Sequence, residues 1–148
     1  MKKVTLENYR TDKYYRGIVR AVEALLSRGE VVAPVDVFIE MHLLTREALN
    51  DWRRGRVPCL ERVIHCNLSA AGRILRILRM HVHDLRLQPS VTVYHRHGKG
   101  PKTRLRFSKS GEPPLEEAYS RHFVRLRSKK RDKHLLNTEE PPETSPAA

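Results

Sequence analysis

Residues 69–107 read SAAGRILRILRMHVHDLRLQPSVTVYHRHGKGPKTRLRF, and the spacing of their apolar side chains changes at Pro89. Before Pro89 the apolar residues recur every three or four positions, which predicts a helix over about 70–87 with Ser69 as its cap. After Pro89 apolar and polar residues alternate, which is typical of β-strands. The stretch therefore predicts helices and strands within one α+β fold.

The alternating part of this stretch predicts a basic β-hairpin. Its strands are expected at Ser90–His97 and Thr103–Ser108, because the residues between them, Gly98–Pro101, favour a turn. One face of the hairpin is expected to pack on the core through Val91, Val93, Leu105 and Phe107. The other face is then expected to expose the basic side chains together with Thr92 and Tyr94.

Helical spacing predicts further helices on both sides of this stretch. Four are expected before it, at about 12–28, 34–42, 46–54 and 60–66. A short C-terminal helix is expected after it, at Leu115–Leu126. The predicted fold is therefore α+β but mainly helical, with about five helices, a basic β-hairpin and a short C-terminal helix.

Residues 1–126 are expected to form a single domain, followed by a disordered tail at 127–148. The tail is first basic and then acidic and rich in proline, and it has few apolar residues to bury. No apolar run approaches the roughly 20 residues that a membrane-spanning helix needs. Two cysteines are too few for a disulfide scaffold, and the first residues lack the apolar run of a secretion signal. We therefore expect a cytoplasmic location and no membrane partner.

The charge of the chain points to a polyanionic partner. Its 148 residues include 29 Lys and Arg against 17 Asp and Glu, which gives a formal net charge of +12. This charge is uneven, because residues 89–111 hold six Lys and Arg and no Asp or Glu. A solvated surface usually mixes both signs. Nucleic acid is thus the first partner to consider, and association with the nucleoid would follow if that nucleic acid is DNA.

Residues 34–64 read PVDVFIEMHLLTREALNDWRRGRVPCLERVI. Two short helices joined by a turn, the second ending in Trp-x-x-Gly, resemble the helix-turn-helix of Cro and the phage repressors. The apolar positions of that motif are occupied by Leu44, Leu49 and Trp52. The chain departs from the family at Ile39 and Leu43, where a small residue and a turn glycine are usual. The resemblance implies that helix 46–54 lies in the major groove of DNA.

Polar side chains on one face of helix 46–54 are the expected base contacts: Arg46, Asn50 and Arg53. In the major groove Arg pairs with guanine and Asn pairs with adenine. Arg54 and Arg56, near the end of the helix, are expected to contact phosphate. The alternative interpretation is a three-helix packing unit in which Trp52 is only a core residue.

Two further elements are expected to contact phosphate. The helix at 70–87 carries four arginines on one side: Arg73, Arg76, Arg79 and Arg86. The hairpin carries Arg96, Lys99, Lys102, Arg104 and Arg106. Tyr94 offers a ring on which a base could stack. The alternatives are a solvated basic face for the helix and a strand edge that lysine and arginine protect from aggregation.

The sequence contains no catalytic or nucleotide-binding motif, and we expect no enzyme activity. The histidines and cysteines lack the spacing of a zinc site, so no metal and no cofactor is expected. We expect a nucleic-acid-binding protein with a regulatory or accessory role, such as transcription regulation, that favours double-stranded DNA over RNA. A homodimer is compatible with this role. The alternatives are an adaptor that docks an acidic protein partner and an RNA- or ribosome-associated protein.

Overall fold

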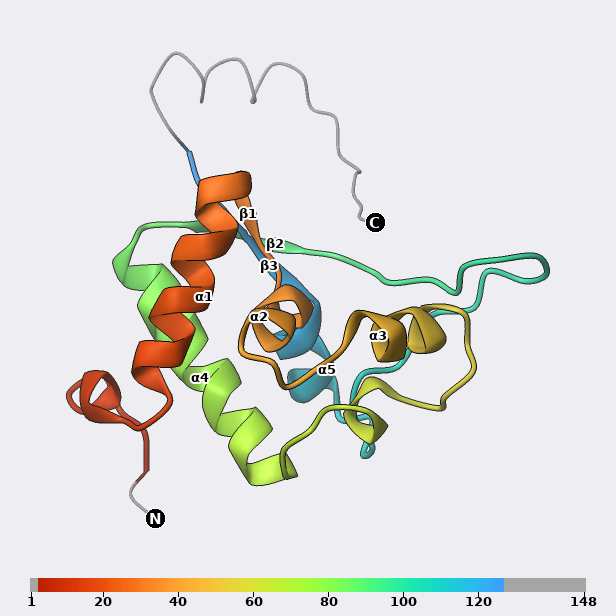
Figure 1. The fold of residues 1–148 in the computed structure, drawn as a ribbon, viewed down its shortest axis with the longest axis horizontal. Coiled ribbons are helices and arrows are strands. Elements are labelled where there is room, and N and C mark those ends of the chain that lie inside the picture. The colour runs from red at the N-terminus through yellow and green to blue at the C-terminus, as the bar shows by residue number, and fades with distance from the viewer. Residues whose placement is uncertain (1–2, 127–148) are drawn as a thin grey trace.

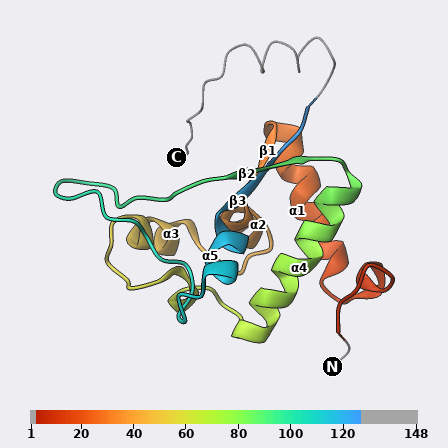
Figure 2. The ribbon, with the colours of Figure 1, turned by 180° about the vertical axis from the view of Figure 1, so that it is seen from behind.

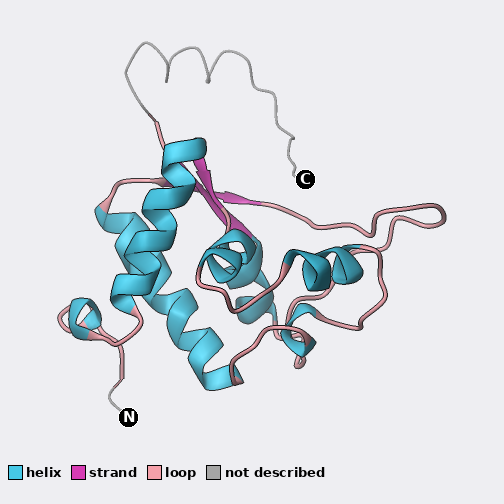
Figure 3. Cartoon of the chain, viewed as in Figure 1, coloured by secondary structure: helices cyan, strands magenta, loops and turns pink. Residues whose placement is uncertain are grey.

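Helices and a small antiparallel sheet make up the computed structural model of this chain, which describes residues 3–126 (Figure 1, Figure 3). Among these residues there are five α-helices, three strands and two 3₁₀ turns, at Tyr9–Thr11 and Leu60–Arg62. The predicted class, mainly helical α+β, is therefore confirmed. The predicted disordered tail at 127–148 lies outside the described residues.

Helices α1 (Tyr15–Arg28) and α4 (Leu68–Asp84) lie side by side at one end of the molecule (Figure 1, Figure 2). Helix α2 (Pro34–Glu40) starts with a proline, which suits the first turn because it has no N–H to leave unpaired, and packs against α1. The apolar stripes of α1 and α4 meet in one core, where these side chains are at most 1% exposed: Ile18, Val22, Ile74 and Leu78.

Two details of the predicted helices differ in the structure. Asn67, and not Ser69, caps α4, because its side-chain oxygen accepts a hydrogen bond of 2.7 Å from the Ala70 N–H. The helix expected at 60–66 is only the 3₁₀ turn Leu60–Arg62. The first difference is a small shift of a boundary. The second prediction is wrong, because no α-helix forms at 60–66.

The sheet has three antiparallel strands in the order β1–β3–β2, so the one of these three that comes last in the sequence lies in the centre. These strands are β1 (Val31–Val32), β2 (Gln88–Val91) and β3 (Arg121–Val124). Val32 pairs with Phe123, and both side chains are buried. This row of the sheet therefore faces the core.

The predicted helix at Leu115–Leu126 is wrong in its second half. Helix α5 (Pro113–Ser120) ends at Ser120, and the chain continues directly into β3. Pairing with β1 and β2 satisfies the backbone of β3 on both sides and buries Phe123. Tertiary pairing thus overrides the helical spacing of the local sequence.

The predicted hairpin is reduced to a loop that reverses direction. Residues 92–107, which we call the arm, leave the sheet after β2, extend outward and return (Figure 1). The two sides share one bridge, between His95 and Arg104, flanked by two backbone hydrogen bonds of 2.8 Å. A longer ladder does not form because β2 pairs with β3 instead.

The predicted faces of the first hairpin strand are reversed. Tyr94 is only 6% exposed, whereas Val91 and Val93 are 66% and 44% exposed. The alternation itself is correct, but the tyrosine ring takes the core side because it buries more apolar surface than a valine. On the returning side of the arm, Leu105 and Phe107 are buried as expected.

An aromatic cluster connects the arm to helix α3 (Arg46–Arg53). The ring of Trp52 lies 5.6 Å from that of Tyr94 and 5.0 Å from that of Phe107. The indole N–H of Trp52 also donates a hydrogen bond of 2.8 Å to the carbonyl of Arg106. Because Trp52 belongs to α3 and its partners belong to the arm, the cluster fixes the position of α3 beside the arm.

Candidate nucleic-acid interface

A turn joins α2 to α3 at the place expected from the sequence. Thr45 caps α3, and its hydroxyl accepts a hydrogen bond of 3.0 Å from the Ala48 N–H. The backbone takes a left-handed conformation at His42, with φ 62°, one residue before Leu43. The apolar positions of the segment are buried or partly buried: Leu44, Trp52 and Leu49. Locally, the chain thus forms a helix, a tight turn and a capped helix.

The three predicted base contacts do not share one environment. Arg46 and Asn50 are exposed on α3. The guanidinium of Arg53 lies over the ring of Tyr94, 4.8 Å from its centroid, and contacts the Nε2 atom of His97. Burial lowers the pKa of this guanidinium. The structure therefore corrects the expected arrangement, because Arg53 faces the arm while Arg46 and Asn50 face outward.

The arm is attached to the C-terminal end of α3. The backbone N–H of His97 donates a hydrogen bond of 2.7 Å to the carbonyl of Arg53. Next to this bond, Arg96 crosses Gly55 so closely that a Cβ on Gly55 would lie 2.8 Å from the Cδ of Arg96. Gly55 also has a φ of 78°, in the left-handed region that favours glycine. Gly55, two residues after the end of α3, thus leaves room for the arm.

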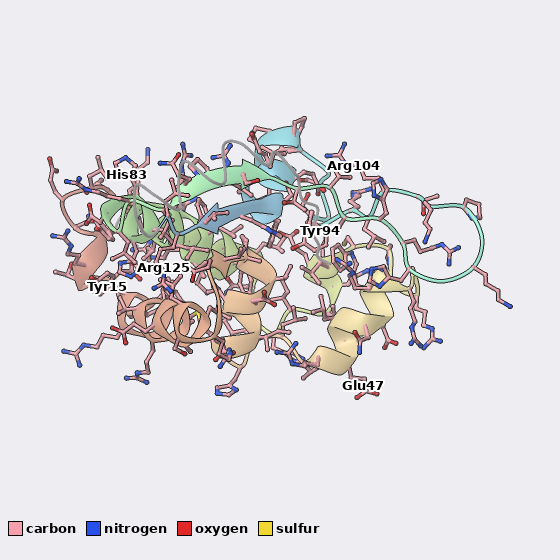
Figure 4. The ribbon with its side chains drawn as sticks, turned by 90° about the horizontal axis from the view of Figure 1, so that it is seen from above. Tyr15, Glu47, His83, Tyr94, Arg104 and Arg125 are labelled. Carbon is pink, nitrogen blue, oxygen red and sulfur yellow. The ribbon has the colours of Figure 1, made fainter. Side chains whose placement is uncertain are left out.

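Together α3 and the arm form one basic surface, which we call the α3–arm surface. Its exposed cations and amide are Arg46, Asn50, Arg54, Arg56, Lys99, Lys102 and Arg104, and the acidic Glu47 is also exposed on α3. Arg56 pairs with Asp51 at 3.3 Å, and the other cations of this surface form no ion pair with any residue in 3–126. In Figure 4, Glu47 and Arg104 point to opposite sides of this end of the molecule. The surface beside the arm therefore keeps most of its positive charge.

Two predicted phosphate contacts are instead bonded to carbonyl groups of their own chain. The Nε atom of Arg106 donates to the carbonyl of Ser108 at 2.8 Å, and its Nη2 atom donates to the carbonyl of Lys109. Arg96 donates to three carbonyls of the arm tip, those of His97, Lys99 and Pro101. Both arginines thus shape loops of the backbone, a use that the sequence analysis did not foresee.

Tyr94, predicted as a stacking platform for a base, is buried. Its hydroxyl lies 2.7 Å from the Nε2 atom of His122. Burial raises the pKa of the Tyr94 hydroxyl and lowers the pKa of His122 to about 4. His122 is therefore neutral near pH 7, and it shares one hydrogen bond with the Tyr94 hydroxyl. The guanidinium of Arg53 covers the ring of Tyr94, so a base cannot stack on this ring.

The arginines predicted on the helix at 70–87 lie apart from the α3–arm surface, and Arg86 follows the end of α4 at Asp84. Arg73 is bonded to Asp12, and the two side chains are only 12% and 4% exposed, so this predicted phosphate contact is a buried ion pair. The other three are exposed: Arg76, Arg79 and Arg86. His83, near the end of α4, and Arg104 lie well apart along the long axis of the molecule (Figure 4). The predicted phosphate contacts thus form two separate groups.

Two carboxylates not expected from the sequence, one partly buried and one buried, hold the base of the arm. Glu116 is partly buried and accepts hydrogen bonds of 2.7 and 2.6 Å from the N–H and hydroxyl of Ser108. Glu61 is 6% exposed and accepts one of 2.7 Å from Tyr119. The available signal was the turn sequence around Ser108, whose backbone donors need acceptors. The sequence does not show which acids accept these hydrogen bonds, because Glu61 lies in the 3₁₀ turn and Glu116 lies in α5.

Within residues 3–126, no group of three or more His, Cys, Asp or Glu side chains is placed to hold a metal ion. No helix in this part of the chain combines the length and the apolar character needed to cross a bilayer. Comparisons of the chain with protein-family models, curated proteins and solved structures found no match. The function of the α3–arm surface is therefore inferred from its own residues.

Proposed function

We propose that this protein binds nucleic acid, without catalysing a reaction, through the α3–arm surface, and that its preferred ligand is double-stranded DNA. The observation that carries the proposal is the junction between α3 and the arm. The arm contains basic residues and no acidic residue. The hydrogen bond from His97 to Arg53 holds the exposed Arg46 and Asn50 at a fixed distance from the basic arm. A helix with base-pairing side chains beside a cationic loop suits a groove and its flanking phosphates.

Helix α3 would supply the base contacts. Arg46 and Asn50 are separated by about one helical turn and are both exposed. An α-helix, with a diameter of about 10–12 Å, fits the major groove of B-DNA, which is about 12 Å wide. In that groove Arg recognises guanine and Asn recognises adenine through paired hydrogen bonds. These two side chains are our candidates for sequence selection.

The arm would supply phosphate contacts next to the groove. Lys99, Lys102 and Arg104 are exposed and have no ion-pair partner among residues 3–126. Binding to phosphate therefore breaks no protein ion pair and releases counterions from the nucleic acid. Contacts of this kind orient a protein on the duplex without reading its sequence.

Double-stranded DNA suits this surface better than double-stranded RNA, because the major groove of A-form RNA is too deep and narrow for side chains of a helix to read. On α3 itself, Glu47 and Asp51 offset part of the positive charge, which favours selective over general binding. A regulatory or accessory role on DNA is the function that we associate with such selectivity. Two copies on neighbouring half-sites would raise the affinity further.

Fluorescence anisotropy with double-stranded DNA, single-stranded DNA and RNA of matched length tests the proposal. We expect duplex DNA to bind most tightly, and its affinity to fall by roughly 10³ or more between about 50 and 200 mM salt. Tighter binding of RNA would contradict the choice of DNA. No binding at low salt would contradict nucleic-acid binding altogether and favour an acidic protein partner.

A pair of double variants tests whether the α3–arm surface is the one used. Lys99→Ala with Lys102→Ala removes two proposed phosphate contacts, so the log–log salt slope should become shallower by about 1.8. Arg16→Ala with Arg20→Ala removes the same charge from exposed positions of α1 and should leave the slope unchanged. Equal slopes for the two double variants would show that binding depends on net charge and not on this surface.

A further inference from the structure

The side chain of Arg96 fills the inside of the arm tip, which we define as residues 97–102. Its guanidinium donates hydrogen bonds to the backbone carbonyls of His97, Lys99 and Pro101. A Cβ on Gly100 would lie 2.6 Å from the Nη2 atom of Arg96, and Gly100 has a φ of 99°. The loop therefore encloses a guanidinium that the sequence alone would place in contact with phosphate.

The inward carbonyls determine where the neighbouring amide groups point. The peptide bonds are trans, and in a trans peptide the C=O and the following N–H point in opposite directions. Because three carbonyls turn toward Arg96, the N–H groups of the next residues turn outward: Gly98, Gly100 and Lys102. None of these three N–H groups donates a hydrogen bond to any residue in 3–126. The tip thus presents unpaired backbone donors on its outer side.

The surroundings of these donors favour an anion. Gly98 and Gly100 have no side chains to cover their amides, and the side chains of Lys99 and Lys102 are exposed on the same loop. The arm has no carboxylate that would compete for the donors. Backbone N–H groups together with a lysine are the donors that bind phosphate in glycine-rich loops.

We propose that the arm tip is a phosphate-binding loop. Arg96 acts inside the loop as a positioning residue, while the outward N–H groups, Lys99 and Lys102 make the contacts. The ligand is a phosphodiester group of the nucleic-acid backbone. That this phosphate belongs to a nucleic acid rests on the proposed function. Such a loop recognises phosphate next to any base, so sequence selection belongs to α3 alone.

Nuclear magnetic resonance of the ¹⁵N-labelled full chain tests the tip residue by residue. The amide signals of Gly98 and Gly100 are followed during titration with a short DNA duplex and, separately, with inorganic phosphate. Gly29 is the internal control, because it is exposed, has an extended backbone and lies at the end of α1. Larger shifts at Gly98 and Gly100 than at Gly29 are the expected result.

The two titrations separate this inference from the proposed function. If anisotropy shows that the duplex binds while Gly98 and Gly100 do not shift, the tip proposal is wrong and the proposed function stands. If no duplex binds, the proposed function is wrong and the phosphate titration decides about the tip. Shifts at both glycines with phosphate would then support a phosphate-binding loop, and their absence would overturn it.

Two substitutions that conserve charge test the part assigned to Arg96. Arg96→Lys should weaken duplex binding about tenfold, the effect of roughly one charge-assisted hydrogen bond, because lysine lacks the planar fork that spans several carbonyls. Arg20→Lys, at an exposed position of α1 outside the proposed interface, is the matched control and should bind as the wild type does. If Arg96→Lys also binds as the wild type does, Arg96 does not position the loop.

Discussion

The backbone N–H of His97 lies 2.7 Å from the carbonyl oxygen of Arg53, to which it donates a hydrogen bond. The two side chains also meet, through the guanidinium of Arg53 and the Nε2 atom of His97. Arg53 is the last residue of α3, and His97 is the first residue of the arm tip. The two parts of the proposed interface are therefore arranged before any ligand arrives, which lowers the entropy cost of binding.

Arg46→Ala and Asn50→Ala should each reduce the preference for a selected DNA sequence by about 1–3 kcal/mol, because each removes one paired base contact. Most of the affinity for a random duplex should remain, since the cations of the arm are unchanged. Competition between a selected and a scrambled duplex measures this difference. Arg20→Ala, at an exposed position of α1, is the control. Loss of both kinds of binding together, or of neither, would refute the base-contact assignment.

Gly55→Ala should disturb the junction of α3 and the arm. The new Cβ would lie 2.8 Å from the Cδ of Arg96, and alanine at a φ of 78° costs about 1–3 kcal/mol. Urea unfolding followed by circular dichroism should show this loss, and anisotropy should show weaker duplex binding. Gly29→Ala is the matched control, because its Cβ would have no neighbour within 4 Å. Wild-type binding by Gly55→Ala would mean that the junction does not matter for the ligand.

Arg73→Ala should destabilise the fold, although Arg73 lies in a series of exposed arginines in the sequence. It would leave the carboxylate of Asp12, whose side chain is 4% exposed, without its cation, a loss of about 3–5 kcal/mol. Arg76→Ala, one turn further along α4, should change the free energy of unfolding by less than about 0.5 kcal/mol. Similar unfolding free energies for both variants would show that the Arg73–Asp12 pair contributes no stability.

The stability of the fold should fall as the solution becomes acidic, in part because of His122. Its pKa in the folded protein, about 4, lies below the ordinary value of 6.5, so the unfolded chain binds this proton more readily. The resulting stability is present above pH 6.5 and is lost as the pH falls toward 4, by up to about 2 kcal/mol between pH 7 and pH 5. His122→Asn should reduce this pH dependence in urea unfolding, whereas His65→Asn, at an exposed position, should keep it. An unchanged slope in His122→Asn would exclude His122 as its source.

Elements whose signals are local could be predicted from the sequence. Helix α3 was placed to within one residue, because Thr45 and Gly55 are standard residues at its two ends. The reversal at residues 98–101 was also predicted from its glycines and proline. These features depend on backbone preferences of a few neighbouring residues, which a single sequence displays.

Features that depend on distant partners could not be predicted in this way. Strand β3 follows α5 without a break in apolar spacing, and only its pairing with β1 and β2 makes it a strand. Tyr94 and Val93 alternate as a strand should, but only the folded chain shows that Tyr94, which contacts Trp52, is the buried one. The candidate site shows the same limit, because Arg96 and Arg104 look alike in the sequence. Only the folded loop shows that Arg96 is bonded to carbonyls of the arm tip.

The order of the strands has a consequence for how the chain folds during synthesis. β1 and β2 each pair with β3 and not with each other, and β3 lies at Arg121–Val124. While the chain grows from the ribosome, the backbone groups of β1 and β2 that pair with β3 therefore stay unpaired until β3 has emerged. Helices α1 and α2 are close in sequence and can pack earlier, because local contacts form faster than distant ones. The arm begins where β2 ends, so its final direction is set only when the last strand is inserted.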